Sequence, residues 1–178
     1  MYHCFTFPDY QLAQTLEEYS KLTDLPITNR DPFSGLEGIL ENQTIARAIF
    51  LDESDVRAHR VTKGGIQGLP AKFLTERALS FASVGNLVAF EVIYALLIYG
   101  IFLFPNIDYC VDVNAIRIFL IRNPVSTLLA DAYHSVHLRN LHGIGIITFC
   151  VPILYKWFIS HLPKSAVFWD RKNGMRWS

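Results

Sequence analysis

LVAFEVIYALLIYGIFLF, residues 87–104, is the stretch of sequence that decides the fold of this chain. Glu91 is the single charged residue among its eighteen. A run of this length fits either a helix that spans a membrane, which needs about 20 apolar residues, or a helix in the core of a globular domain. Asn86 can cap a helix and Pro105 ends one, so the run predicts one long helix.

Two features of the apolar segments favour a core over a membrane. An acid at the centre of a spanning helix costs about 2.5–3.5 kcal/mol, and Glu91 lies inside the first segment. The second apolar segment, residues 143–161, is interrupted by Pro152, and its uncharged part, residues 143–155, has the length of a buried helix.

The residues between the two segments give the stronger argument. If both segments spanned a bilayer, residues 105–142 would form a short loop outside it. This loop carries two predicted helices, over 113–121 and 128–136, whose apolar faces need a cover. We therefore expect a compact helical core. The alternative is a membrane protein with one or two transmembrane helices, at 87–104 and 143–161.

Shorter periodic segments predict further helices. Thr15-Leu16-Glu17-Glu18 has the pattern of a capping box, which predicts a helix over residues 16–22. Further helices are expected over Thr44–Phe50, through Val56 and Val61, and over Val113–Ile121. Another is expected from Pro70 to the stop signal Gly85-Asn86, and its apolar face consists of Leu74, Ala78, Phe81 and Ala82. The last is expected over Ser126–Arg139, and its apolar stripe consists of Leu129, Ala132, Tyr133 and Val136.

The remaining residues predict a small hairpin, loops and a tail. Pro8-Asp9 is a turn signal between two short, partly aromatic segments, so a small N-terminal β-hairpin is expected. Residues 26–43 form a predicted loop, Lys63–Gly68 a break, and residues 163–178 a polar tail. The predicted fold is mainly α, a single helical domain over residues 1–178.

Composition bounds the class of protein. Sixteen basic and sixteen acidic residues give no net charge, so there is no basic excess of the kind that binds nucleic acid. Only 18% of the residues are charged, against about 25% in a typical soluble domain, so a partner, a membrane or further chain is expected to cover apolar surface. The three cysteines form no CxxC pair, and the N-terminus is no signal peptide, which predicts a nuclear or cytoplasmic location, with a membrane as the alternative.

One cluster of side chains could bind a metal. It consists of Asp131, His134, His137 and His142. Spacings of three residues place neighbouring members side by side on a helix, but successive members point in increasingly different directions around the helix axis. No HExxH motif or matching cysteine accompanies them. Because Asp131 and His134 fall opposite the predicted apolar stripe, we interpret the cluster as a solvated polar face.

The other candidate motifs for binding or catalysis are better explained by structural roles. Lys63-Gly64-Gly65 has the wrong order for a phosphate-binding loop, and no nucleophile elbow, dinucleotide or kinase signature occurs. Glu91 is expected to pair with Arg117 or Arg122. Aromatic and basic residues alternate at 155–158 and 169–172, a pattern that can stack on single-stranded nucleic acid. In a chain without net charge we interpret it as an amphipathic helix and its packing tail. The sequence therefore predicts no enzyme, no catalytic, cofactor-binding or metal residues, and no cofactor.

Several phrases of the sequence resemble the DUF7745 family of uncharacterised, legume-rich plant proteins. They are FTFPDYQLAQTLEEYSKLTDLPI (5–27), DPFSGLE (31–37), KGGIQGLPAKFL (63–74), ALLIYGIFLFPNID (95–108), VDVNAIRIFL (111–120), NPVSTLLADAYHSVHLRN (123–140) and LYKWFISHLP (154–163). The resemblance covers nearly the whole chain and supplies no catalytic residues. The chain ends at 173–178, where members of the family look as though they continue, so a C-terminally truncated copy is expected.

Residues 5–27 are also similar to the start of the plant mobile domain, a mainly helical module associated with transposable elements and nuclear silencing proteins. This resemblance implies a non-enzymatic helical domain derived from a plant mobile element and acting through protein interactions. Its partner would be an unknown protein or the missing C-terminal part of a longer chain. A second alternative is a nucleic-acid-associated remnant of transposition machinery.

Overall fold

The computed structural model describes residues 4–6, 9–28, 40–142 and 150–161. Most of the predicted loop 26–43 and the whole predicted tail 163–178 lie outside these residues. The described helices are α1 (Leu16–Thr23), α2 (Asn42–Ala48), α3 (Glu53–His59), α4 (Ala71–Ser83), α5 (Leu87–Leu97), the π-helical η1 (Ile98–Leu103), α6 (Val113–Ile121), α7 (Pro124–His142) and α8 (Val151–His161). The prediction of a mainly α fold is confirmed.

Two small antiparallel sheets accompany the helices. The predicted N-terminal hairpin is present, with β1 (Phe5–Thr6) paired to β2 (Gln11–Leu12). The second sheet has the order β3-β4-β5, where β3 is Val61–Lys63, β4 is Ile66–Pro70 and β5 is Cys110–Asp112. It joins a local hairpin to a strand about forty residues further along the chain, with Leu69 opposite Val111.

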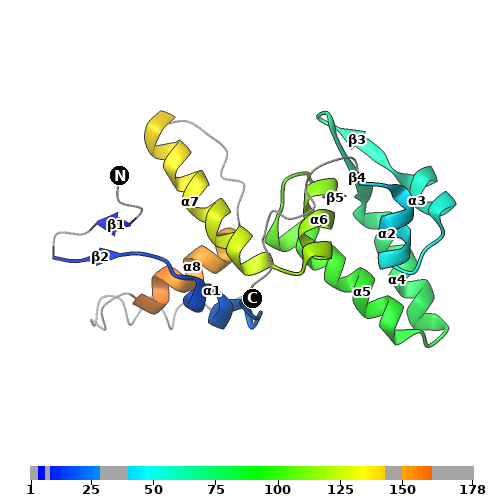
Figure 1. Ribbon diagram of the computed structural model, residues 1–178, viewed down its shortest axis with the longest axis horizontal. Coiled ribbons are helices and arrows are strands. Elements are labelled where there is room, and N and C mark those ends of the chain that lie inside the picture. The colour runs from blue at the N-terminus through cyan, green and yellow to red at the C-terminus, as the bar shows by residue number, and fades with distance from the viewer. Residues whose placement is uncertain (1–3, 7–8, 29–39, 143–149, 162–178) are drawn as a thin grey trace, which may run out of the picture.

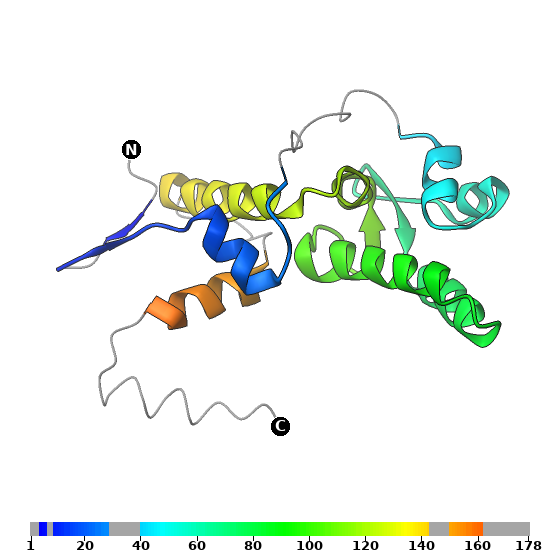
Figure 2. The same ribbon diagram turned by 60° about the horizontal axis from the view of Figure 1, so that its bottom comes forward.

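The elements form an elongated molecule, and different segments of the chain build its two ends (Figure 1). At one end, α1 packs against both α7 and α8, so the two ends of the described chain meet there. At the other end, α4 and α5 form an antiparallel pair below the three-stranded sheet, with α2 and α3 above it (Figure 2). The long helix α7 leads from α6 to the first end.

The buried residues form one core cluster that runs through both ends. It extends from Tyr19 of α1 through Leu74 of α4, Ile93 of α5 and Val111 of β5 to Ile153 of α8. The long apolar run 87–104 contributes Ala89, Ile93 and Leu96, none of which is exposed. The expectation of a helical core around this run is therefore confirmed. None of the described helices is long and apolar enough to cross a membrane.

Local signals in the sequence placed several helix boundaries correctly. Thr15 and Glu18 form the predicted capping box, in which the Glu18 amide donates to Thr15 Oγ1 (3.3 Å) and the Thr15 amide donates to Glu18 Oε2 (3.0 Å). Asn86 caps α5 by accepting from the amide of Ala89 at 3.2 Å. Helix α6 has the predicted bounds, Val113–Ile121.

Two predictions about elements were wrong. Lys63–Gly68, expected to be a break, forms most of the β3–β4 hairpin, and Val61, expected in a helix, begins β3. The stripe predicted for α7 is confirmed in part: Ala132 is buried and Leu129, Tyr133 and Val136 are half-buried, but the most buried side chains also include Val125 and Leu128 nearer the start of the helix.

Candidate functional site

An uncovered apolar face runs along α5 and η1. Its six large side chains, which we call the α5 face, are Leu87, Val88, Tyr94, Ile98, Ile101 and Phe102. Val88 is 62% exposed, Tyr94 55% and Phe102 49%. Their spacings of three, four and seven residues place them on one side of the helix. In Figure 2 this helix, in green, lies on the side of the molecule opposite α2 and α3.

The other side of the same helix is buried. Ala89, Ile93, Leu96 and Leu103 point into the core, and Gly100 packs directly against Val111 of β5. A surface helix normally has a polar outer side, whereas this helix is apolar on both. Apolar patches of several hundred Å² on a protein surface mark places where something binds. The outer side of α5 is therefore a candidate functional surface.

Glu91 is the one charged residue on this outer side. It is exposed, and the ion pairs among the described residues do not join it to Arg117 or Arg122, so the predicted pairing was wrong. The physical reason is its position on the helix, because Glu91 follows Leu87 and Val88 by one turn and faces away from the core with them.

A polar cavity between the end of η1, the start of α6 and the middle of α7 is the second candidate. It has a volume of about 230 Å³ and is lined by Asn106, Asp112, Asn114, Thr127, Asp131 and His134, among others. Partial burial raises the pKa of the Asp131 carboxyl, an effect that the nearby His134 offsets in part. Asp112 is 2% exposed, and its Oδ1 already accepts from two amides of α6.

The cluster of Asp131, His134, His137 and His142, interpreted from the sequence as a solvated polar face, lies partly at this cavity. Asp131 is half-buried at the cavity wall, so it is less exposed than a solvated face implies, while His134 is exposed at the same wall. His137 is half-buried, and the side chain of His142 lies outside the described residues. Among the described residues no group of three or more histidine, cysteine or acidic side chains could hold a metal ion.

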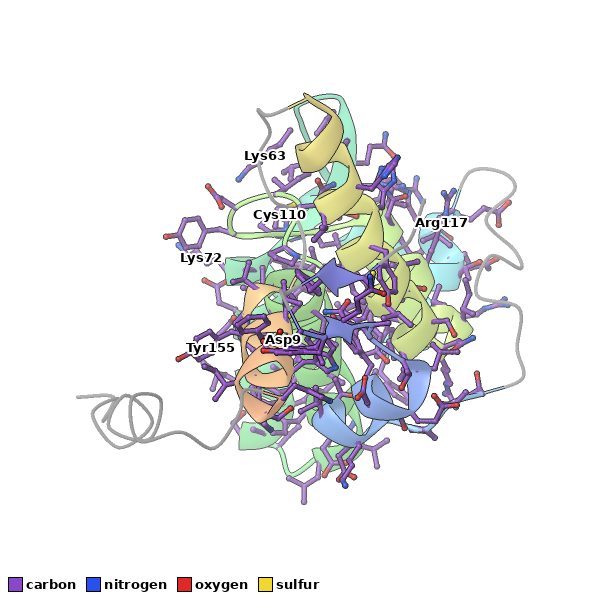
Figure 3. All side chains as sticks on the ribbon, turned by 90° about the vertical axis from the view of Figure 1, so that its left-hand side faces the viewer. Asp9, Lys63, Lys72, Cys110, Arg117 and Tyr155 are labelled. Carbon is purple, nitrogen blue, oxygen red and sulfur yellow. The ribbon has the colours of Figure 1, made fainter. Side chains whose placement is uncertain are left out.

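A basic site lies between the β3–β4 hairpin and α6. Arg60 and Arg117 line a hollow of about 360 Å³ together with Leu40 and Gln67. Arg60 donates to the carbonyl of Leu40 (3.2 Å) and to Asn42 Oδ1 (2.6 Å). Burial, and then repulsion by Arg117, lower the pKa of Arg60. Arg117 lies on the opposite side of Figure 3 from Lys63 and Lys72, so these three cations do not form one stripe.

The alternating aromatic and basic residues of α8 follow the amphipathic interpretation. Trp157 is fully buried, Phe158 is half-buried, and Tyr155 and Lys156 are exposed. The Trp157 indole donates to Glu18 Oε2 at 2.8 Å, so it holds α8 to α1 rather than offering a stacking surface. The second such pattern, 169–172, lies outside the described residues.

The three cysteines are free thiols in this fold. Cys110 and Cys150 are buried, as expected for structural thiols, and Cys4 is half-buried. Burial raises the pKa of the Cys110 thiol and of the Cys150 thiol, which makes the nucleophilic thiolate form scarcer. They therefore add no reactive group to either candidate site.

Comparison with known proteins identifies the family. A family model described as "Domain of unknown function (DUF7745)" matches residues 1–178. The chain belongs to the DUF7745 family. For this DUF7745 domain, neither the curated proteins nor the solved structures gave a match.

Membership in the DUF7745 family confirms the resemblance found in the sequence and assigns no catalytic residue. The plant origin and the relation to the plant mobile domain stay predictions. What sequence reasoning missed in this DUF7745 domain is the uncovered outer side of α5. The signal was present in the run 87–104, because a helix that is apolar on all sides needs a cover on each side, and the described residues cover one side of it.

Proposed function

We propose that this DUF7745 domain is a non-enzymatic interaction module that binds another protein through the α5 face. The observation that carries the proposal is the α5 face itself: six large apolar side chains on the outer side of a helix whose inner side is already packed. Covering such a surface releases water from apolar side chains, at about 25 cal/mol per Å². A docking function explains why these apolar side chains stand at exposed positions, where they lower the solubility of the free chain.

The polar cavity supports an enzymatic role less well. Of its acids, Asp112 serves as the cap of α6. The cavity also holds the hydroxyls of Thr127 and Ser135, but the Thr127 hydroxyl donates to the Asn123 carbonyl, and among the described residues no hydrogen bond joins Ser135 to His134 in a nucleophile–base pair. The partner we propose for the module is a protein or a further part of a longer chain. A nuclear site of action, derivation from a plant mobile element and the nucleic-acid alternative stay predictions from the sequence.

The test is photo-crosslinking of the full chain. Tyr94 is replaced with the photoreactive aromatic residue p-benzoylphenylalanine, and the matched control carries the same replacement at Phe50, between α2 and α3. The two side chains are similarly exposed, at 55% and 51%. We expect light-dependent protein adducts from position 94 and none from position 50. Adding V88E and I101E to the position-94 variant should abolish these adducts. Folded protein without any adduct at position 94 would contradict the proposal.

A further inference from the structure

We propose that the occupant of the α5 face is a second copy of this chain, packed antiparallel through a two-fold axis between Tyr94 and Ala95. The inference rests on the proposed function, because it names the partner of the same surface. A two-fold interface needs a surface that is complementary to itself. The residues of the α5 face meet this condition in a specific way.

By residue number, the exposed apolar positions of α5 and η1 are arranged symmetrically about the midpoint between positions 94 and 95. In an antiparallel pair centred there, Leu87 lies opposite Phe102 of the second copy, and Val88 lies opposite its Ile101. Two small or medium apolar side chains at one end of the face thus meet two larger ones at the other. Tyr94 lies beside the axis, where its ring contacts the ring of its own counterpart.

The same symmetry keeps the two copies of Glu91 apart. Glu91 lies opposite Ile98 of the second copy and not opposite the second Glu91. Seven residues of helix separate the two levels, which is about 10 Å along the axis. At that distance, close to the Debye length in physiological salt, the two carboxylates repel each other only weakly. Glu91 lies between Val88 and Tyr94 on the α5 face, so each carboxylate also loses part of its water on association, and this cost lowers the affinity of the dimer.

The size of the α5 face fits a dimer. From their exposed fractions, its six side chains offer on the order of 500 Å² of apolar surface. A standard interface buries about 800 Å² per partner, of which about 60% is non-polar, so the apolar part is about 500 Å². A dimer through this face therefore has the area of a specific interface, which a contact through two or three residues would lack.

The charge of the chain favours association with itself over association with a charged partner. Sixteen basic residues balance sixteen acidic ones, so two copies experience no net repulsion. The face holds one charge and offers little to select a strongly acidic or basic protein.

The experiment measures the mass of the full chain in solution by sedimentation equilibrium across a range of concentrations. We expect a dimer for the natural sequence. I98E places a carboxylate opposite Glu91 of the second copy, so its dissociation constant should rise at least 100-fold. The double variant E91K/I98E places Lys opposite Glu at both sites and should return the constant to within about tenfold of the natural value. F50E, an exposed apolar-to-acid change away from α5, should leave it unchanged.

Three results would overturn the second-copy proposal: a natural chain that is monomeric at every concentration, a dimer that I98E leaves intact, or a failure of E91K/I98E to restore the dimer. Both positions are exposed, so these variants keep the fold, and circular dichroism checks this. Failure here is distinct from failure of docking as such. Crosslinks from position 94 to a different protein would leave the proposed function standing, whereas an adduct with twice the mass of one chain supports the second copy.

Discussion

Gly100 shows how one residue fixes which side of a helix faces the core. It lies on the buried side of η1, against Val111 of β5. A Cβ atom at this position would lie 2.7 Å from Val111 Cβ, closer than two carbon atoms can pack. Since Val111 is itself fully buried, neither group can move aside freely. The close approach of η1 to β5 therefore requires glycine here.

Replacing Gly100 with alanine should destabilise the fold by about 1–2 kcal/mol. Alanine gains up to about 1 kcal/mol in helix propensity over glycine, but inserting a methyl group into a packed core costs about 1–3 kcal/mol, and the clash with Val111 wins. Urea unfolding followed by circular dichroism measures the difference. G100A/V111A is the control, because removing the valine methyls should recover part of the loss and give a coupling of about 1 kcal/mol. Equal stability of G100A and the natural chain would contradict the described contact.

The residue scale also shows why the predicted pairing of Glu91 failed and why Asp131 is less exposed than expected. The sequence gives the position of Glu91 and Asp131 along a helix, but which side of that helix is covered depends on neighbours far away in the chain. Helix α5 turns Glu91 outward because Gly100 meets β5, and the packing of α7 beside α6 places Asp131 at a cavity wall. The apolar pattern on all sides of the run 87–104 was visible in the sequence, but which side of the helix stays uncovered was not, for the same reason.

At the scale of elements, Asp112 connects β5 to α6. It ends the strand opposite Gly68, and its Oδ1 then accepts from the amides of Asn114 (2.7 Å) and Ala115 (3.0 Å) at the start of the helix. A buried amide that loses its acceptor costs about 1–3 kcal/mol. This one side chain therefore links the central sheet to the helix that leads into α7.

Asp112→Ala should lower the free energy of unfolding by about 2 kcal/mol, because an N-cap and a buried hydrogen bond are lost together. Asp112→Asn should cost less than about 1 kcal/mol, since the amide oxygen can accept from the same two donors. Thermal and urea unfolding of the two variants check this. If both variants lost stability equally, the negative charge of Asp112 rather than its capping role would be what the fold requires.

Elements with local signals were predictable, and elements that depend on distant contacts were not. Thr15 and Asn86 cap their helices as the sequence indicated, because a cap acts within three residues. Gly64 and Gly65 have φ of 57° and 80°, which suits the turn of a two-residue hairpin, and the Gly-Gly pair between short strand segments could have revealed β3 and β4. The pairing of β4 with β5 spans about forty residues and leaves no comparable local pattern.

At the scale of the whole molecule, Glu18 holds the two ends of the described chain together. Its carboxylate accepts from the Thr15 amide, from the Trp157 indole (2.8 Å) and from Nε2 of His161 (2.8 Å), so one side chain of α1 anchors α8. Partial burial acts to raise the pKa of Glu18, but the hydrogen bonds from Trp157 and Thr15 and the charge of His161 together lower it below its ordinary value.

This lowered pKa gives the contact between α1 and α8 a defined dependence on pH. A carboxyl whose pKa is lower in the folded than in the unfolded chain stabilises the fold above its ordinary pKa, here 4.5, and the contribution is lost as the pH falls through the folded value. Glu18→Gln should therefore be about 1–2 kcal/mol less stable than the natural chain at pH 7, and the gap should close progressively below pH 4.5. Urea unfolding between pH 3 and pH 7 measures the gap. Glu17→Gln, an exposed neighbour on α1, is the matched control and should show no such convergence. A gap of constant size across this range would mean that the shape of Glu18, and not its charge, joins the two ends of the chain.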